Sequence, residues 1–193
     1  MRTTILTSLR ILAVFTLLTG VLYPLAVTGL AQLVMPEEAS GSLLQARGKT
    51  VGSSLIGQEF SSPHYLWGRP SATAPFAYNA AASSGSNLGP LNPALAKAVQ
   101  QRVATLRAAD PLNQAAVPSD LVCASASGLD PEISAPAAAY QVARIARVRG
   151  APVAAVEQAL AGCTREPMLG IIGPRRVHVL CANVALDQIV PQR

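Results

Sequence analysis

The sequence predicts an α+β fold: one N-terminal transmembrane helix, followed by a single extracytoplasmic mixed α/β domain. Three observations lead to this prediction. Residues 11–35 form an uncharged apolar run, residues 92–162 repeat apolar residues at helical spacing, and residues 175–186 alternate them as a strand does. The chain has 193 residues, of which half are hydrophobic and 13% charged, so it has room for one folded domain plus an accessory element.

The first element is a membrane-spanning helix predicted over residues 11–35, which read ILAVFTLLTGVLYPLAVTGLAQLVM. As a helix the run is about 37 Å long, enough to cross a hydrocarbon core of about 30 Å with some tilt. A cleaved signal peptide is the alternative, because Arg2 and Arg10 precede the run and a small-residue site ends at Ala31. The run is longer than the usual signal core, which favours the membrane helix.

Four residues recur at every fourth position along this run: Thr16, Gly20, Pro24 and Thr28. This spacing leaves one helix face smooth enough for a second helix to approach closely. Proline breaks a soluble helix, but in a membrane a neighbouring helix or a local adjustment shelters the freed carbonyl. We predict a membrane-helix packing face here, with a chance recurrence among many small residues as the alternative.

The charges at the two ends of the run predict its orientation. Two arginines precede it and two glutamates follow it: Arg2, Arg10, Glu37 and Glu38. The positive-inside rule keeps the basic end in the cytoplasm, so residues 1–10 are expected there and residues 36–193 on the outer side. In a bacterium the outer side is the periplasm, which makes this a single-pass protein of the inner membrane.

Three cysteines lie in the outer part of the chain: Cys123, Cys163 and Cys181. An odd number leaves at least one thiol unpaired, and the absence of a C-x-x-C or Cys/His cluster argues against zinc, so no metal site is expected. We interpret the cysteines mainly as small buried hydrophobic residues. One disulfide is the alternative, because an oxidising compartment permits it.

Net charge gives no indication of nucleic-acid binding. Without the two N-terminal arginines, 13 basic residues stand against 10 acidic ones with no basic run, although the isoelectric point is near 9.6. The densest basic group is Arg144, Arg147 and Arg149, near a predicted helix end where the macrodipole favours cations. We expect these arginines on the helix surface, together with Gln141.

The outer domain begins with irregular sequence. Residues 36–62 mix glycine and serine with short apolar groups, which predicts short strands and turns. Residues 64–90 are dense in proline, glycine, serine and aromatic residues, which predicts an ordered but irregular surface segment.

Three amphipathic helices are predicted next, over residues 92–110, 134–150 and 152–162. The first opens with an asparagine cap and a proline, and the second closes at a glycine. The residues expected on the inward faces are Leu95, Val99, Val103, Leu106, Ala138, Val142, Ile145, Val153, Val156 and Leu160.

The best strand candidate is RRVHVLCANVAL, residues 175–186. Val177 and Val179 alternate there with Arg176 and His178, as they do in a strand with one buried face. Strand geometry therefore predicts that His178 points away from the valines.

A phosphate-binding loop is not supported by the sequence. Gly48-Lys49-Thr50 resembles the end of such a loop, but Leu43 stands where its first glycine is required. No convincing strand and helix flank the segment.

A membrane-tethered periplasmic serine hydrolase is the alternative function that the residues leave open. Such an enzyme needs a nucleophile, a base and a group that orients the base. The candidates are Ser83, Ser84 or Ser86 as nucleophile, His64 or His178 as base, and Asp120 or Asp130 as the orienting group. Neither a G-x-S-x-G elbow nor an S-x-x-K and K-T-G pair is present, so the motifs do not favour it.

The segment SSGSNLGP, residues 83–90, predicts a shaped surface loop. Glycine permits backbone conformations closed to other residues, while serine and asparagine satisfy turn amides. We expect this loop to contact a partner through Ser84, Gly85, Ser86, Asn87, Leu88 and Gly89.

Several motifs follow one another in an order that resembles a known family: VGSSLIGQEF, YLWGRPSA, SSGSNLGPLNP, VPSDLVCASASGLDPEIS, AAAYQVARIAR and RRVHVLCANVALD. Together they resemble the C subunit of the Kdp potassium-transporting ATPase over essentially the entire chain. Each motif alone is weak, but the set is specific.

This resemblance implies a non-catalytic accessory subunit of a high-affinity, ATP-driven potassium uptake pump. It implies help in assembly, and a role as a catalytic chaperone that raises the ATP affinity of the P-type subunit through a transient ternary complex. No cofactor is expected on the chain alone. The implied partners are the channel-like potassium-binding subunit, the P-type subunit, a small single-span subunit and the lipid bilayer, with no nucleic acid.

The resemblance also implies which residues are linked to nucleotide or partner: Gln141, Ser127, Gly128, Leu129 and Asp130. Since the predicted topology turns these residues outward, a cap over the potassium entrance of the channel-like subunit is the physically easier role. The sequence departs from the family twice. Ala126 replaces a glycine of the usual SGSGLDP, and residues 173–176 lack the acidic residue that usually precedes Pro-Arg.

Overall fold

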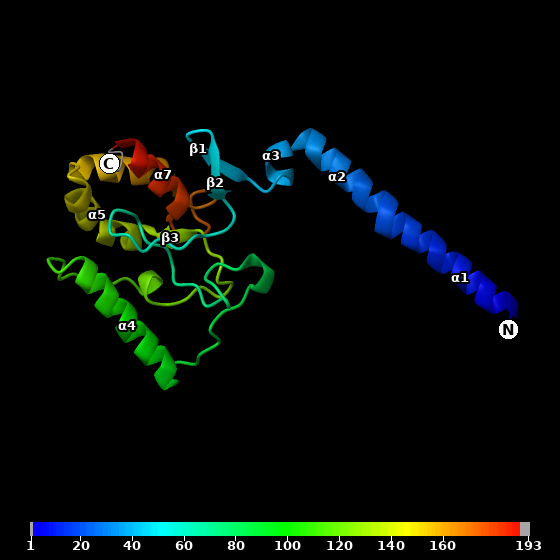
Figure 1. Cartoon of the computed structure of the whole chain (residues 1–193), viewed down its shortest axis with the longest axis horizontal. Coiled ribbons are helices and arrows are strands. Elements are labelled where there is room, and N and C mark those ends of the chain that lie inside the picture. Colours follow the sequence, from blue (N-terminus) through cyan, green and yellow to red (C-terminus); the bar gives the residue numbers. More distant parts are fainter. Residues whose placement is uncertain (1, 190–193) are drawn as a thin grey trace. The chain divides into compact units, whose positions relative to one another are not determined.

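The computed structural model describes residues 2–189, and the chain divides into two compact units, residues 1–43 and 44–193, which are described separately. The first unit is one long apolar helix over Arg2–Val34, with a mean hydropathy of 2.1 (Figure 1). By length and composition it can cross a membrane, as predicted. It comprises α1 (Arg2–Leu17), the π-helical turn η1 (Leu18–Leu22) and α2 (Tyr23–Val34), and α3 (Pro36–Ala39) follows.

The π-helical turn has a local cause in the sequence. Pro24 has no N–H to donate to the carbonyl of Gly20, and the wider turn lies directly before it. The N–H of Tyr23 reaches back five residues to the carbonyl of Leu18. The helix therefore continues through the proline without a break.

A two-stranded hairpin opens the irregular part of the chain, as predicted for residues 36–62. It pairs β1 (Leu43–Ala46) with β2 (Lys49–Ser53). Arg47 and Gly48 at its turn both have positive φ angles, 51° and 74°, which suits the right-handed twist of a two-residue hairpin loop. The segment that resembles the end of a phosphate loop is therefore the turn and second strand of a hairpin.

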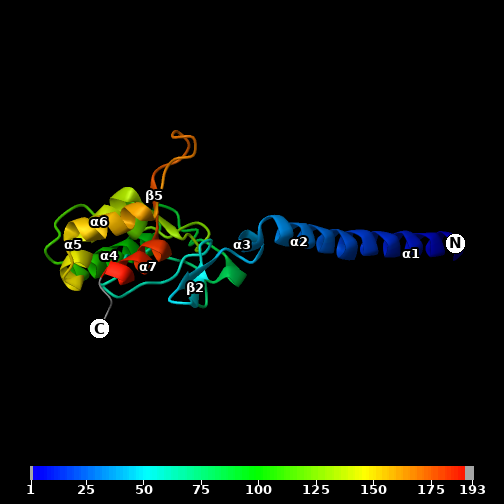
Figure 2. The ribbon, with the colours of Figure 1, turned by 90° about the horizontal axis from the view of Figure 1, so that it is seen from above.

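The core of the second unit lies between a small sheet and three helices (Figures 1 and 2). The sheet is antiparallel, in the order β3 (Glu132–Ser134), β5 (Arg176–His178) and β4 (Thr164–Arg165). Helix α6 (Val153–Gly162) packs against both α5 (Ala135–Arg149) and α7 (Val179–Ile189), and α5 also contacts the sheet. Helix α4 (Pro93–Ala109) adds Leu106 to the core.

The three predicted helices are confirmed, together with their ends. The side chain of Asn92 accepts the N–H of Ala94 ahead of α4, and Ser134 accepts the N–H of Ala137 ahead of α5. Gly150 ends α5 in the left-handed conformation, with φ 65°. Two inward faces are only partly as expected. In α4 only Leu106 is fully buried, and Val153 at the start of α6 is exposed.

The predicted strand over residues 175–186 is wrong beyond its first part. β5 ends at His178, and the remaining residues form α7. The buried residues Val179, Ala182 and Leu186 follow helical spacing, which the short alternation of valines concealed. His178 is not exposed on the outer face as predicted: it is buried, because its ring lies between the segment at Ser54 and the first turn of α7, and bonds to both.

The interpretation of all three cysteines as unpaired small hydrophobic residues is also wrong. Cys163 and Cys181 form a disulfide, and Cys123 is free. The bond joins the end of α6 to the first turn of α7 because the intervening hairpin brings its two ends together. At its base the carbonyl of Cys163 accepts the N–H of His178.

The arginines and the glutamine expected on the surface of α5 are mostly buried. The exposed fractions of Gln141 and Arg144 are 1% and 2%, and Arg149 is buried as well, while Arg147 remains exposed. The helix macrodipole therefore does not explain why these arginines lie where they do on α5. They are buried because an irregular segment crosses this face of α5, and its backbone needs hydrogen-bond partners.

Candidate partner-binding surface

That irregular segment, residues 63–67, has no strand partner, and two amide side chains hold it instead. Asn183 of α7 accepts the N–H of Leu66 at 2.8 Å and donates to its carbonyl at 3.0 Å. Gln141 of α5 accepts the N–H of Trp67 at 2.9 Å and donates to its carbonyl at 3.1 Å. Each amide thus satisfies both backbone groups of one residue, as a neighbouring strand would. We call residues 63–67 the clamped segment.

Two buried arginines bind the remaining carbonyls of the clamped segment. Arg144 donates to Pro63 at 2.5 Å and to Tyr65 at 3.1 Å, and Arg149 donates to His64 at 2.7 Å. Charged donors make strong hydrogen bonds to carbonyls in a buried environment. The segment is therefore fixed by side chains from α5 and α7 along its whole length.

The same arginines orient the aromatic rings of this segment. Arg144 lies over the ring of Trp67 at 4.5 Å, and Arg149 lies over the ring of Tyr65 at 5.1 Å. Burial lowers the pKa of the Arg144 guanidinium to about 10, which still leaves it charged at neutral pH. Gln141 is buried and bonds both backbone groups of Trp67, so it acts as a positioning residue for Trp67.

The predicted surface loop pairs with a second loop that lies more than forty residues further along the chain. The carbonyl of Ser127 accepts the N–H of Ser84 at 3.0 Å and the hydroxyl of Ser83 at 2.9 Å. A Cβ added to Gly85 would lie 2.9 Å from the carbonyl oxygen of Ala126. The close approach lies on the Gly85 side of the contact, so alanine is tolerated at 126. We call residues 83–89 and 125–130 the paired loops.

Ser71 joins the paired loops to the segment between them. Its hydroxyl donates to the carbonyl of Gly128 at 2.7 Å and accepts the N–H of Tyr78 at 2.9 Å. Gly128 has φ 68°, and a Cβ there would come within 2.8 Å of the Ser84 carbonyl. The paired loops therefore have a defined shape, held by the hydroxyls of Ser71 and Ser83 and by two close glycine contacts.

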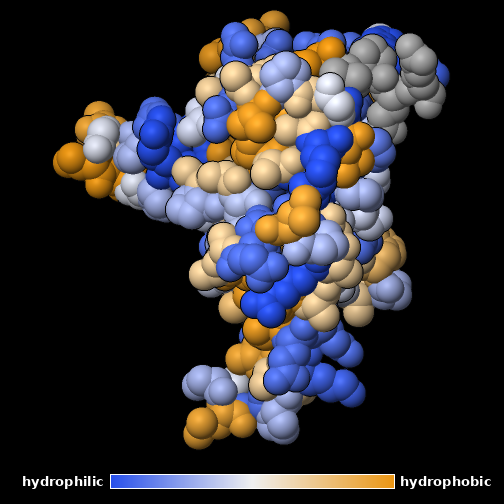
Figure 3. All heavy atoms as spheres, turned by 90° about the vertical axis from the view of Figure 1, so that its left-hand side faces the viewer, coloured by the Kyte–Doolittle hydropathy of each residue, from blue (hydrophilic) through white to orange (hydrophobic). Residues whose placement is uncertain are grey.

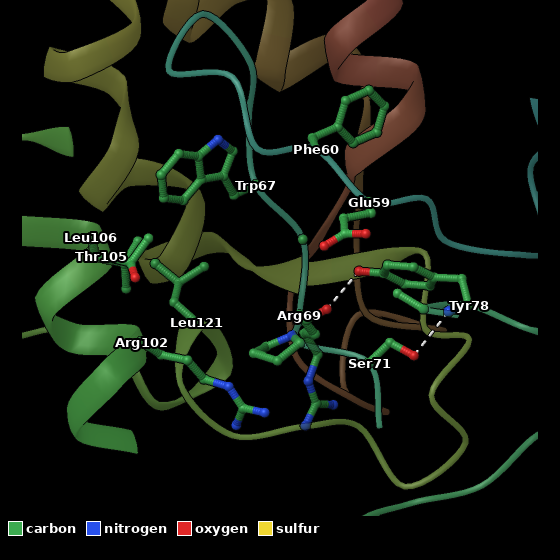
Figure 4. A pocket seen from close by; sticks show the side chains of 13 residues that line it. Glu59, Phe60, Trp67, Arg69, Ser71, Tyr78, Arg102, Thr105, Leu106 and Leu121 are labelled. Atoms are coloured by element: carbon green, nitrogen blue, oxygen red, sulfur yellow. Dashed lines mark hydrogen bonds between the residues drawn. The ribbon is translucent and has the colours of Figure 1, made fainter. Parts of the chain in front are cut away.

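A pocket adjoins the paired loops (Figure 4). Its volume is about 290 Å³, and its lining includes Phe60, Trp67, Tyr78, Arg69 and Arg102. Figure 4 shows both arginines on the same side of the pocket. Aromatic walls with guanidinium donors can receive an apolar side chain that carries a carbonyl or carboxylate.

The polar groups of this pocket are partly satisfied. Arg69 pairs with Asp130 at 3.0 Å, while its buried Nε has no hydrogen-bond partner among the described residues. The hydroxyl of Tyr78 donates to the Arg69 carbonyl at 2.5 Å. Burial, followed by the nearby carboxylates of Glu59 and Asp130, raises the pKa of Tyr78 to about 12. Tyr78 is therefore a neutral hydrogen-bond donor at any physiological pH.

The predicted site residues separate into three groups. The paired loops unite residues 84–89 with residues 127–130, and Asp130 reaches the pocket through Arg69. Gln141 is buried against Trp67, and the residues of the membrane-helix face belong to the other unit. Ser71 and Asn183 are functional candidates that the sequence alone does not indicate. The motifs YLWGRPSA and RRVHVLCANVALD contain them, but a single sequence gives no sign of their contacts.

The hydrolase candidates His178, Ser83 and Asp120 are bonded elsewhere. In His178, Nδ1 accepts the N–H of Cys181, so Nε2 carries the proton and donates to the Ser54 carbonyl at 2.8 Å. Ser83 donates to a carbonyl, and Asp120 accepts the N–H of Ser134 at 2.8 Å. Among residues 2–189, no group of three His, Cys, Asp or Glu side chains is arranged to hold a metal ion.

A long apolar helix that can cross a membrane by length and composition, joined to a mixed α/β domain with paired surface loops, fits the class of membrane-associated accessory domains. The comparisons agree. The family described as "K+-transporting ATPase, c chain" matches residues 5–188. The chain therefore belongs to the KdpC family, and it is a non-catalytic subunit of an ATPase complex in which another subunit hydrolyses ATP.

Three relatives illustrate how close the similarity is, and each is described as a potassium-transporting ATPase KdpC subunit. The protein from Polaromonas naphthalenivorans is 65% identical over 92% of this chain and 91% of its own length. The protein from Variovorax paradoxus is 61% identical over 93% of both chains. The protein from Herpetosiphon aurantiacus is 57% identical over 98% of both. The family resemblance seen in the sequence is confirmed.

Proposed function

We propose that this chain is the single-pass accessory subunit of a potassium uptake ATPase in the bacterial inner membrane. In this proposal residues 1–10 lie in the cytoplasm, residues 11–35 span the bilayer, and residues 36–193 form a periplasmic domain. Arginines at the start of the apolar helix and glutamates after it support the orientation. The disulfide between Cys163 and Cys181 supports it independently, because such bonds persist in oxidising compartments.

The proposed role is assembly of the complex through two surfaces. In the membrane, the face that carries Thr16, Gly20, Pro24 and Thr28 packs against a partner helix; a Cβ added to Gly20 would meet nothing closer than 3.9 Å, so the face is open. Outside the membrane, the paired loops and the adjoining pocket cap the channel-like, potassium-binding subunit. The P-type subunit and a small single-span subunit complete the proposed complex.

The observation that carries this proposal is the direct pairing of the two loops. Residues 84–89 are half-buried or exposed, yet the N–H of Ser84 is bonded to the carbonyl of Ser127, and Gly85 lies close against Ala126. A preformed surface loses little conformational entropy when it binds, which favours a stable interface.

The proposed effect on ATP is indirect. We propose that the chain raises the ATP affinity of the P-type subunit as a catalytic chaperone, with no nucleotide held by this chain alone. Gln141 serves that effect through Trp67, because a side chain that is 1% exposed and bonded to backbone on both sides has no free group for ATP. Residues 127–130 serve it as part of the partner surface.

Crosslinking in the assembled membrane complex tests the proposal. A photoreactive residue in place of Ser86 should form an adduct with the channel-like subunit, whereas one in place of Gln100, exposed on α4, should not. Omitting the chain should lower the yield of the complex and raise the KM for ATP. Equal yield and equal KM without the chain would refute the proposed role. An added protease that fails to reach the domain in intact spheroplasts would refute the orientation.

A further inference from the structure

The hairpin between β4 and β5 projects from the domain and ends in apolar side chains. Figure 2 shows it standing away from the helices, and Figure 3 shows a narrow projection with a hydrophobic end. Met168, Leu169, Ile171 and Ile172 are all exposed there, Leu169 and Ile171 each to 84%. Soluble surfaces rarely gather large apolar side chains at a convex tip, so this one marks an interaction site.

The backbone of the tip shows that these residues are not there for local stability. Leu169 has φ 54° and Gly170 has φ 77°. The left-handed conformation favours glycine or asparagine, and leucine is costly in it. Both its exposure to water and its backbone conformation disfavour a leucine at position 169. Such a residue is expected where function, rather than stability, determines which side chain is present.

The chemistry of the tip favours lipid over a protein partner. Residues 167–174 read PMLGIIGP and contain no polar side chain, so a specific protein interface would find no side-chain hydrogen bonds there. Four backbone N–H groups of the tip are bonded within it. Met168 and Ile172 exchange both N–H···O bonds at 2.9 Å, and the N–H groups of Gly170 and Ile171 donate to the carbonyls of Pro167 and Met168. Hydrocarbon requires this internal pairing.

Charged residues surround the base of the hairpin but not its tip. Arg175 pairs with Glu166, and Glu132 pairs with Arg165 at 3.0 Å and Arg176 at 3.3 Å. Three arginines against two glutamates leave one net positive charge. An apolar end above a weakly cationic base matches the order of acyl chains and headgroups at a bilayer surface.

We propose that the apolar tip, residues 167–174, inserts into the surface of the bilayer to which the chain's own N-terminal helix is anchored. The proposal rests on the proposed membrane anchorage, which keeps the tip at a high local concentration near lipid. A single short apolar loop binds lipid weakly when free, so the tether is what makes insertion stable. The tip is then a second, reversible membrane contact of the domain.

Fluorescence of the full chain in proteoliposomes tests this. In a Cys123→Ser background, an environment-sensitive dye is attached at Ile171→Cys or, as a control, at Leu112→Cys, which is an exposed leucine outside the hairpin. At 171, doxyl-labelled lipid should quench the dye, and quenching by aqueous iodide should be lost. At 112 the pattern should reverse.

The outcomes separate this proposal from the anchorage on which it rests. Flotation with the liposomes reports the anchor alone. A chain that floats while the dye at 171 remains open to iodide would overturn insertion and leave the anchor standing. In the assembled complex, a photoreactive residue at position 171 should give lipid adducts; a protein adduct instead would assign the tip to a subunit and overturn the proposal.

Discussion

Replacing Gln141 with leucine tests the central contact of the clamped segment. The glutamine side chain has four hydrogen bonds: two with the backbone of Trp67, one from Arg144 at 2.6 Å and one to the carbonyl of Ala137 at 3.2 Å. Leucine has a similar volume and no polar atoms. The variant therefore removes the hydrogen bonds without a large cavity.

The expected loss of stability follows from the two groups left unpaired. Each buried backbone group without a partner costs about 1–3 kcal/mol, so the N–H and carbonyl of Trp67 together cost about 2–6 kcal/mol. Domains of this size are stable by about 5–15 kcal/mol. A loss of about 4 kcal/mol lowers the unfolding midpoint by about 8–16 °C, since each kcal/mol shifts it by about 2–4 °C at this length.

The assay is thermal unfolding of the full chain in detergent, followed by tryptophan fluorescence. Trp67 is the only tryptophan, so its emission reports directly on the clamped segment. Gln101→Leu, at an exposed site on α4, is the matched control and should leave the midpoint unchanged. An unchanged midpoint and emission in Gln141→Leu, with the effect on ATP affinity lost, would show that Gln141 touches nucleotide directly and refute the reasoning.

Three further outcomes are expected. Gly85→Ala should lower stability by about 1–3 kcal/mol in chemical denaturation, because its Cβ meets the facing loop at 2.9 Å. Tyr78 should ionise only near pH 12 in an ultraviolet titration, and its contribution to stability, fully present below pH 10, should be lost as pH rises through 12, by roughly 2–3 kcal/mol. Reduction of the Cys163–Cys181 bond, which closes 18 residues, should cost about 3 kcal/mol and raise the count of reactive thiols from one to three.

Each of these has its own control. Gly89→Ala should be silent, because no heavy atom lies within 4 Å of its added Cβ; equal losses at both glycines would contradict the close contact. Tyr78→Phe should remove the last step of the titration and no other. The Tyr78→Phe variant also separates the contribution of Tyr78 to the pH dependence of stability from that of Arg144. The lowered pKa of Arg144 makes the free energy of unfolding rise with pH in the same range. Three reactive thiols before reduction would show that the disulfide does not form.

The local signals in the sequence were sufficient for the helices and their ends. An asparagine followed by proline, and a glycine after a basic turn, each act within a few residues, so the ends of α4 and α5 near Asn92 and Gly150 could be predicted. The apolar helix was equally clear, because a long uncharged run has few other interpretations.

What the sequence could not show depends on contacts between distant segments. Gln141 and Arg144 read as a polar helix face, and only the approach of residues 63–67 explains their burial. The paired loops were recognised one at a time, since nothing local indicates that Ser84 meets Ser127. The disulfide was underestimated for the same reason: its two cysteines meet only because a hairpin lies between them.

The clamped segment also sets an order of events during synthesis. Asn183, which holds Leu66, lies 117 residues further along the chain, in the last helix. Contacts of such sequence separation form late, and they cannot form at all on an unfinished chain. A product truncated before this helix would leave both backbone groups of Leu66 without their partner. Only a completed chain holds the clamped segment at Leu66, so the fold itself distinguishes finished chains from fragments.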